Sequence, residues 1–196
     1  MTLAMMEDVV AFGDDPASLD AIARPKAALA IWWRSLPGDM RAGLEALDLD
    51  TIDDLSLDLD AGAPLDATLR DAGYPNAVAA PLSGDIDLLV RRHSALTGED
   101  RLRLRLEVVD TDACRRFHAD YVTLRLLCTY AGPGTQWCRA AASDAICEVP
   151  TGAVGVFKGR LLLDPPTVLH RSPPIAAMGE RRLVLAIDPI RSCESR

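Results

Sequence analysis

The sequence is poor in histidine and in aromatic residues. It has three histidines in 196 residues, and Phe, Trp and Tyr together make up 5% of the chain. A metal site built on imidazole therefore has few candidate ligands. The sequence also lacks a Gly-rich phosphate loop and a Gly-x-Ser-x-Gly motif, which argues against nucleotide hydrolysis of the P-loop type and against α/β-hydrolase chemistry.

Positive charge and long apolar runs are lacking as well. The net charge is -8 and the isoelectric point is about 4.8, so bulk electrostatics favour neither nucleic acid nor an anionic membrane as a partner. Residues Met1 to Asp15 include acidic residues where a signal peptide needs a positive flank. No apolar stretch approaches the ~20 residues that cross a bilayer. We therefore expect a cytoplasmic protein.

The five cysteines contain no C-x-x-C pair and are odd in number. This pattern predicts reduced thiols in preference to a disulfide framework, although Cys128 and Cys138 could approach each other across a turn. The residues in question are Cys114, Cys128, Cys138, Cys147 and Cys193.

The first hundred residues are predicted to form helices and loops. Apolar spacing indicates helical segments over 16–36 and 38–49, and a further helix from an N-cap at Ser83 to about Leu96, with Gly98 as its stop. His93 lies on the apolar side of that helix and is interpreted as a core residue. The acidic segment 47–60 lacks the order of a calcium loop, so it is interpreted as a solvated face.

From residue 101 the hydrophobic period changes from helical to two. The segment RLRLRLEVV alternates leucine with arginine, and further strands are expected at 121–130, 153–157, 160–163, 167–170 and 182–188, separated by turns rich in Pro and Gly. Short strands at this spacing are typical of a sandwich or barrel. We predict an α+β protein with a helical region over 1–98 and a β-barrel core over 99–196, in one integrated domain.

Two of the three histidines fall in the β half. His118 and Asp120 are spaced i and i+2, which directs both side chains to one face of an extended segment. His170 ends a later strand that a barrel could bring beside the first. Two imidazoles and one carboxylate on one face of a metal leave about three positions open, as in non-haem Fe(II) oxygenases. The alternative is a hydrogen-bonded His118–Asp120 pair in a turn, with His170 packed against the proline-rich loop.

The order H-x-D, distant His and downstream Arg resembles the iron and 2-oxoglutarate dependent oxygenases. The segments are FHADYVTLRLLCTY, GAVGVFKG, VLHRSPPI and GERRLVLAID. The resemblance implies a double-stranded β-helix (jelly-roll, cupin-like) and metal ligation by His118, Asp120 and His170. It also implies that Arg181 or Arg182 anchors the far carboxylate of 2-oxoglutarate, with Tyr130 helping to hold it. Many members of this family carry Ser or Thr two residues after that Arg, where this chain has Leu183 or Val184.

The stretch from LRLEVV through LLCTYAGPGTQW to HRSPP and GERRL is similar to an uncharacterised bacterial family of unknown function. This resemblance implies an association with zinc-handling genes. The oxygenase resemblance implies decarboxylation of 2-oxoglutarate to succinate, coupled to hydroxylation of a small-molecule or protein substrate that the sequence does not identify. The alternative is a non-catalytic Zn(II) protein of metal homeostasis that uses the same three ligands. The oligomeric state stays open.

Overall fold

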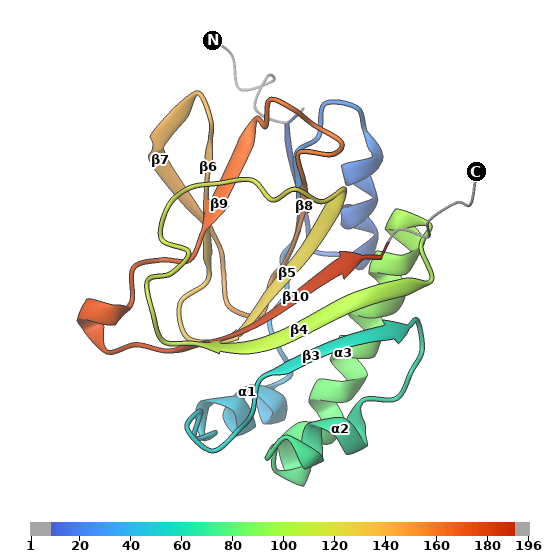
Figure 1. Ribbon diagram of the computed structural model, residues 1–196, viewed down its shortest axis with the longest axis vertical. Coiled ribbons are helices and arrows are strands. Elements are labelled where there is room, and N and C mark those ends of the chain that lie inside the picture. The colour runs from blue at the N-terminus through green and yellow to red at the C-terminus, as the bar shows by residue number, and fades with distance from the viewer. Residues whose placement is uncertain (1–8, 191–196) are drawn as a thin grey trace.

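Two β-sheets of unequal size build the fold. The computed structural model describes residues 9–190, so part of the Met1 to Asp15 segment and Cys193 lie outside the described residues. The larger sheet has seven strands in the order β1-β2-β8-β5-β10-β4-β3, and the smaller has three in the order β7-β6-β9. Apart from the parallel β1–β2 pair, the ladders are antiparallel. This is the predicted double-stranded β-helix (Figure 1).

Helices and strands alternate in the first half of the chain, and strands dominate the second. In chain order the elements are β1 Val10–Gly13, the 3-10 helix η2 Pro16–Ala23, β2 Leu29–Trp32, α1 Gly38–Glu45, β3 Leu55–Asp60, α2 Asp66–Asp71, α3 Asn76–Thr97, β4 Arg101–Val109, β5 Leu124–Ala131, β6 Thr135–Arg139, β7 Ala142–Val149, β8 Val154–Lys158, β9 Val168–Arg171, the 3-10 helix η3 Ala176–Met178 and β10 Arg182–Pro189.

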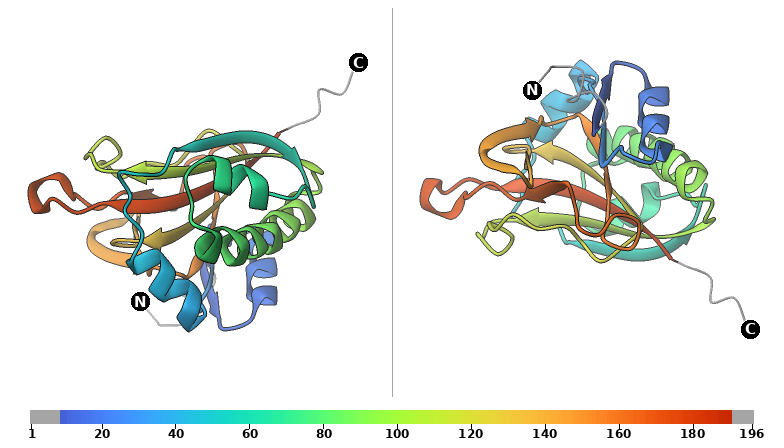
Figure 2. Two further views of the ribbon diagram at one scale, coloured as in Figure 1. Left: turned by 90° about the horizontal axis from the view of Figure 1, so that it is seen from below. Right: turned by 90° about the horizontal axis from the view of Figure 1, so that it is seen from above.

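The seven-stranded sheet separates two cores. On one face the leucines of β4, at positions 102, 104 and 106, are fully buried in one cluster with the apolar side of α3. Burial of this kind stabilises the fold at roughly 25 cal/mol per Å² of apolar surface. Helices α1 to α3 lie on this side of the sheet (Figure 2). The other face meets the three-stranded sheet, with Leu127, Trp137 and Ala186 in the second core.

The prediction of helices and loops for the first half was wrong for three segments. Strands β1, β2 and β3 all join the large sheet. Strand β2, LAIW, is buried along its whole length, and a continuous apolar run of this kind cannot be distinguished from a buried helix by periodicity. Strand β3, LSLDLD, does alternate between apolar and polar residues. Its Asp58 pairs with Arg103 of β4 at 2.8 Å.

Several boundaries also differ from the prediction. Helix α3 begins at Asn76, so Ser83 lies inside the helix and is not its cap. Residues 160–163 form a turn where a strand was expected, and β6 and β7 form a hairpin that was not predicted. Six of the eight residues of β7 are exposed, which explains why the strand has no apolar alternation.

The four described cysteines are free thiols, as predicted, so Cys128 and Cys138 do not pair. His93 is fully buried, in agreement with its assignment to the core. Among residues 9–190, no helix combines the length and hydrophobicity that a membrane crossing requires.

Candidate metal centre

His118 and His170 lie side by side because their backbones form an isolated antiparallel β-bridge. The His118 amide donates to the His170 carbonyl at 3.0 Å, and the His170 amide donates back at 2.9 Å. His170 belongs to β9 of the small sheet, and His118 precedes β5 of the large one. The bridge therefore brings together two segments that are far apart in the sequence and places their rings at a centroid distance of 4.8 Å.

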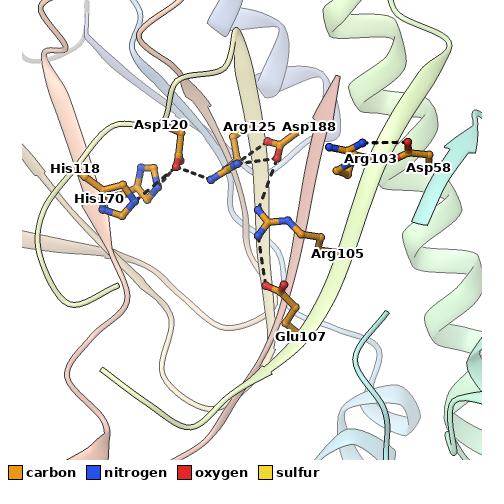
Figure 3. A network of polar contacts seen from close by, with 9 residues as sticks. All are labelled: Asp58, Arg103, Arg105, Glu107, His118, Asp120, Arg125, His170 and Asp188. Carbon is orange, nitrogen blue, oxygen red and sulfur yellow. Dashed lines mark hydrogen bonds and ion pairs between the residues drawn. The ribbon is translucent and has the colours of Figure 1, made fainter. Parts of the chain in front are cut away.

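Asp120 completes a group of three potential ligands. One ligand atom from each of His118, Asp120 and His170 lies within 4.8 Å of the other two. The His170 Nε2 atom lies 3.0 Å from Asp120 Oδ2, and the His118 Nε2 atom lies 3.7 Å from Asp120 Oδ1. Figure 3 shows both rings directed toward this carboxylate.

The loop that carries Asp120 is fixed by its backbone. The Asp120 carbonyl accepts a hydrogen bond from the Arg160 amide at 2.9 Å, and the Thr123 carbonyl accepts one from the Gly159 amide at 2.8 Å. A Cβ atom at Gly159 would lie 2.1 Å from the Val122 carbonyl oxygen, so only glycine permits this approach. The metal-ligand loop is thereby held against the turn that follows β8.

The orientation of each imidazole has a physical cause. The Nδ1–H group of His118 donates to the Arg116 carbonyl at 2.9 Å, which leaves the Nε2 lone pair for a metal, as second-shell hydrogen bonds do in known metal sites. The His170 ring packs on Phe157 at a centroid distance of 4.7 Å. Burial lowers the pKa of His170, although Asp120 opposes the shift, so this ring is a neutral ligand at pH 7.

The two oxygens of Asp120 have different surroundings. Oδ2 is buried beside the His170 Nε2 atom, 3.0 Å away, whereas Oδ1 lies 2.6 Å from the guanidinium of Arg125. Burial raises the pKa of Asp120, but its contacts with His170, Arg125 and His118 outweigh that effect and hold the pKa at about 2. The carboxylate is therefore ionised and presents a buried oxygen beside two imidazoles, a donor set that fits a divalent transition metal.

The same pocket contains a buried arginine. The pocket has a volume of about 290 Å³ and is lined by His118, His170 and Arg182, among others. Arg182 donates to the Pro133 carbonyl and to the hydroxyls of three side chains, at distances from 2.6 to 3.1 Å; the hydroxyls belong to Ser172, Thr129 and Thr135.

The charge of Arg182 is not neutralised by an ion pair within residues 9–190. Its side chain is almost fully buried, and burial lowers its pKa to about 10 against the opposing influence of Glu148 and Cys114. It remains a cation at neutral pH. A buried charge without a counter-ion is costly, and four bonds occupy four of its five N–H groups. Arg182 can therefore accept an anion in the pocket.

The other two expected cosubstrate residues lie elsewhere. Arg181 is half-exposed and pairs with Asp50 on the surface, so of the two neighbouring arginines only Arg182 reaches the pocket. Tyr130 lies on the opposite face of the large sheet, in the core beneath the helices. Its hydroxyl donates to Asp85 Oδ2 at 2.7 Å, which is a structural contact away from the pocket.

Five pocket or network residues were missed as site residues. Polar contacts to Arg182 come from Thr129, Thr135 and Ser172 instead of from a Ser or Thr two residues downstream. Arg125 pairs with Asp120 and Asp188. The available signal was a charged residue inside the otherwise apolar strand LRLLCTY.

Comparison with known proteins defines the class of the chain. The chain belongs to the family described as Protein of unknown function (DUF1826), whose model matches residues 13–188. No curated protein sequence shows a significant match to it.

The fold is similar to that of solved oxygenases. The rice dioxygenase for auxin oxidation is 16% identical, with a TM-score of 0.53 over 95% of this chain and 84% of that chain. A protein from Shewanella oneidensis, assigned provisionally as an oxygenase, is 11% identical, with a TM-score of 0.51 over 92% of this chain and 88% of that one. At these identities the likeness establishes the double-stranded β-helix.

Proposed function

We propose that the protein is a non-haem Fe(II) and 2-oxoglutarate dependent oxygenase. One observation carries the proposal: two of the three ligands, His118 and His170, line the same pocket as Arg182, and the third, Asp120, lies 3.0 Å from His170. Arg182 is buried there without an ionic partner among residues 9–190. A protein that only binds a metal needs the three ligands but gains nothing from the positive charge of Arg182. A cosubstrate that chelates the metal and also has a second carboxylate uses both the metal ligands and Arg182. The likeness of the fold to that of the rice dioxygenase for auxin oxidation supports this assignment.

The residues divide the work of such an enzyme. His118, His170 and Asp120 would hold the ion from one side and leave the other coordination positions open. Arg182 would bind the carboxylate of 2-oxoglutarate that is remote from the metal, through its charge and its remaining N–H group. When bound, iron and 2-oxoglutarate supply the oxidising chemistry of this enzyme class, which hydroxylates a substrate. Leu127 and Val184 give the pocket apolar walls, which would limit the access of water to the bound group.

An anaerobic titration tests the proposal. Fe(II) and 2-oxoglutarate added without oxygen should produce a visible metal-to-ligand charge-transfer band, and His118→Ala should abolish it. This variant keeps the backbone bridge to His170 and removes a partly exposed side chain, so we expect it to fold. Tyr121→Phe is the matched control, because Tyr121 is exposed and adjacent to Asp120, and it should retain the band.

Two results would count against an oxygenase. Tight binding of zinc with no band in the presence of iron and 2-oxoglutarate would favour the metal-binding alternative. Failure to bind either metal, with His170→Ala affecting only the free energy of unfolding, would show that the three side chains form a structural cluster.

A further inference from the structure

Arg125 lies between the metal-ligand Asp120 and a second buried carboxylate. Its Nε and Nη2 atoms each lie 2.7 Å from an oxygen of Asp188, and its Nη1 atom lies 2.6 Å from Asp120 Oδ1. All three side chains are less than a fifth exposed. Figure 3 shows the row that results, in which the guanidinium separates the carboxylate of the candidate centre from that of β10.

The fold fixes this arrangement through two neighbouring strands. Arg125 belongs to β5 and Asp188 to β10, and these strands are paired up to Leu126 and Ile187, the adjacent residues. The strand pairing therefore places the backbone of Arg125 beside that of Asp188, within reach of the two side-chain contacts. Asp120 is held independently by the backbone contact of its own loop with Arg160.

We propose that Arg125 is a positioning residue that holds Asp120 Oδ1, so that Asp120 offers only Oδ2 to the metal. This inference rests on the metal centre of the proposed function. The observation behind it is the division between the two oxygens. Oδ1 lies 2.6 Å from the Arg125 guanidinium and 3.7 Å from His118 Nε2, whereas Oδ2 is buried and lies 3.0 Å from His170 Nε2, away from that cation. A carboxylate that binds through one oxygen takes one coordination position. If it bound through both, one of the positions needed for 2-oxoglutarate and oxygen would be lost.

Asp188 offsets the positive charge that Arg125 places beside a metal ligand. An unpaired guanidinium next to Asp120 would repel a divalent cation. The two-point contact with Asp188 neutralises it and fixes its plane, leaving Nη1 directed at Asp120. A lysine has no planar fork and cannot make both contacts with the same geometry. Arginine is therefore the side chain that these two carboxylates require.

Metal binding by variants tests the positioning role. Zn(II) and Co(II) are titrated separately into the full-length protein, with zinc followed by calorimetry and cobalt by its visible absorption. Arg125→Gln should weaken zinc binding by about 10- to 100-fold, the usual effect of losing an outer partner of a metal ligand. Arg125→Lys should give an intermediate loss. The cobalt bands should weaken in Arg125→Gln, because a second Asp120 oxygen raises the coordination number.

Two further variants separate positioning from folding and from charge. Arg125→Gln combined with Asp188→Asn removes the clamp without leaving an unpaired buried carboxylate, and it should still bind zinc weakly while its unfolding midpoint recovers. Arg103→Gln is the matched control, since Arg103 belongs to the neighbouring strand and pairs only with the surface carboxylate of Asp58 in Figure 3. It should leave zinc affinity and the cobalt spectrum unchanged.

Three outcomes would overturn the inference. Zinc affinity within twofold of the parent in Arg125→Gln would show that Asp120 needs no clamp. Full affinity in Arg125→Lys, or recovery of affinity in the double variant, would assign the effect to charge alone. Because these measurements use zinc and cobalt without 2-oxoglutarate, they remain decisive even if the anaerobic iron titration gives no band.

Discussion

Replacement of Arg182 by lysine separates the role of Arg182 from that of its neighbour Arg181. The substitution keeps a positive charge in the pocket but removes the planar fork. Four of the five N–H groups of Arg182 are used by protein oxygens, so one remains for an incoming carboxylate. We expect Arg182→Lys to weaken the binding of 2-oxoglutarate and Arg181→Lys to leave it unchanged, because Arg181 lies outside the pocket and pairs with Asp50.

The size of the effect follows from the number of bonds at stake. One hydrogen bond to a charged group contributes about 1.5–3 kcal/mol, and each 1.4 kcal/mol is about tenfold in affinity. The loss of the single available N–H contact should therefore weaken 2-oxoglutarate binding by about 10- to 150-fold. A titration of the charge-transfer band with 2-oxoglutarate under anaerobic conditions, at saturating Fe(II), measures this difference.

Thermal unfolding of the same variants provides the control for folding. Arg182→Lys also leaves hydroxyls of the pocket without their donor, so its unfolding midpoint should fall even if no cosubstrate is present. The reasoning is refuted if Arg182→Lys binds 2-oxoglutarate within twofold of the parent. It is refuted equally if Arg181→Lys produces the larger loss, because the exposed side chain would then be the anchor.

Three further predictions concern the fold around the pocket. Burial lowers the pKa of His93 to about 4 in the folded protein, against 6.5 when unfolded, with Asp188 and Leu124 opposing the shift. The unfolded chain therefore binds an extra proton as the pH falls from 6.5 to 4, and the free energy of unfolding should decrease by up to about 3 kcal/mol. Urea denaturation at several pH values should show this decrease in the parent protein and not in His93→Leu. Tyr130→Phe removes the bond to Asp85 and should cost about 1 kcal/mol in urea denaturation, with zinc affinity in calorimetry unchanged; a loss of affinity would restore Tyr130 to the site. Gly132 has a φ of +76°, and a Cβ there would lie 2.0 Å from the Arg181 carbonyl oxygen, so Gly132→Ala should cost more than about 2 kcal/mol in the same assay; an unchanged midpoint would contradict this.

The fold class could be predicted because the second half of the chain contains the regular signals of its architecture. Strand β4 alternates perfectly, since one face packs on α3 and the other carries arginines. Strand β2 gave no such signal, because it is buried on both faces and its sequence is uniformly apolar. Strand β7 gave none for the opposite reason, since most of it is exposed. Periodicity therefore identifies half-buried strands and misses the two extremes.

The three metal ligands of the candidate site could be predicted from the sequence, but most of the residues that support them could not. His118 and Asp120 share a face by their spacing alone, and the structure brings His170 beside them. The choice between Arg181 and Arg182 depends on which face of β10 meets the pocket. The sequence RLVLAID is apolar on both faces, so alternation could not decide. Tyr130 was misplaced for the same reason, because the even-numbered residues of β5 face the helices.

The two arginines of the pocket region, Arg125 and Arg182, differ in a way that only the three-dimensional structure reveals. Arg125 is balanced by Asp188 and Asp120, which lie 63 and 5 positions away in the sequence. Arg182 is surrounded by neutral oxygens. A balanced cation has no net charge left for a ligand, so it can only orient its neighbours. An unbalanced one attracts an anion into the pocket. The positions of carboxylates on neighbouring strands thus determine which arginine positions a metal ligand and which is available to a cosubstrate.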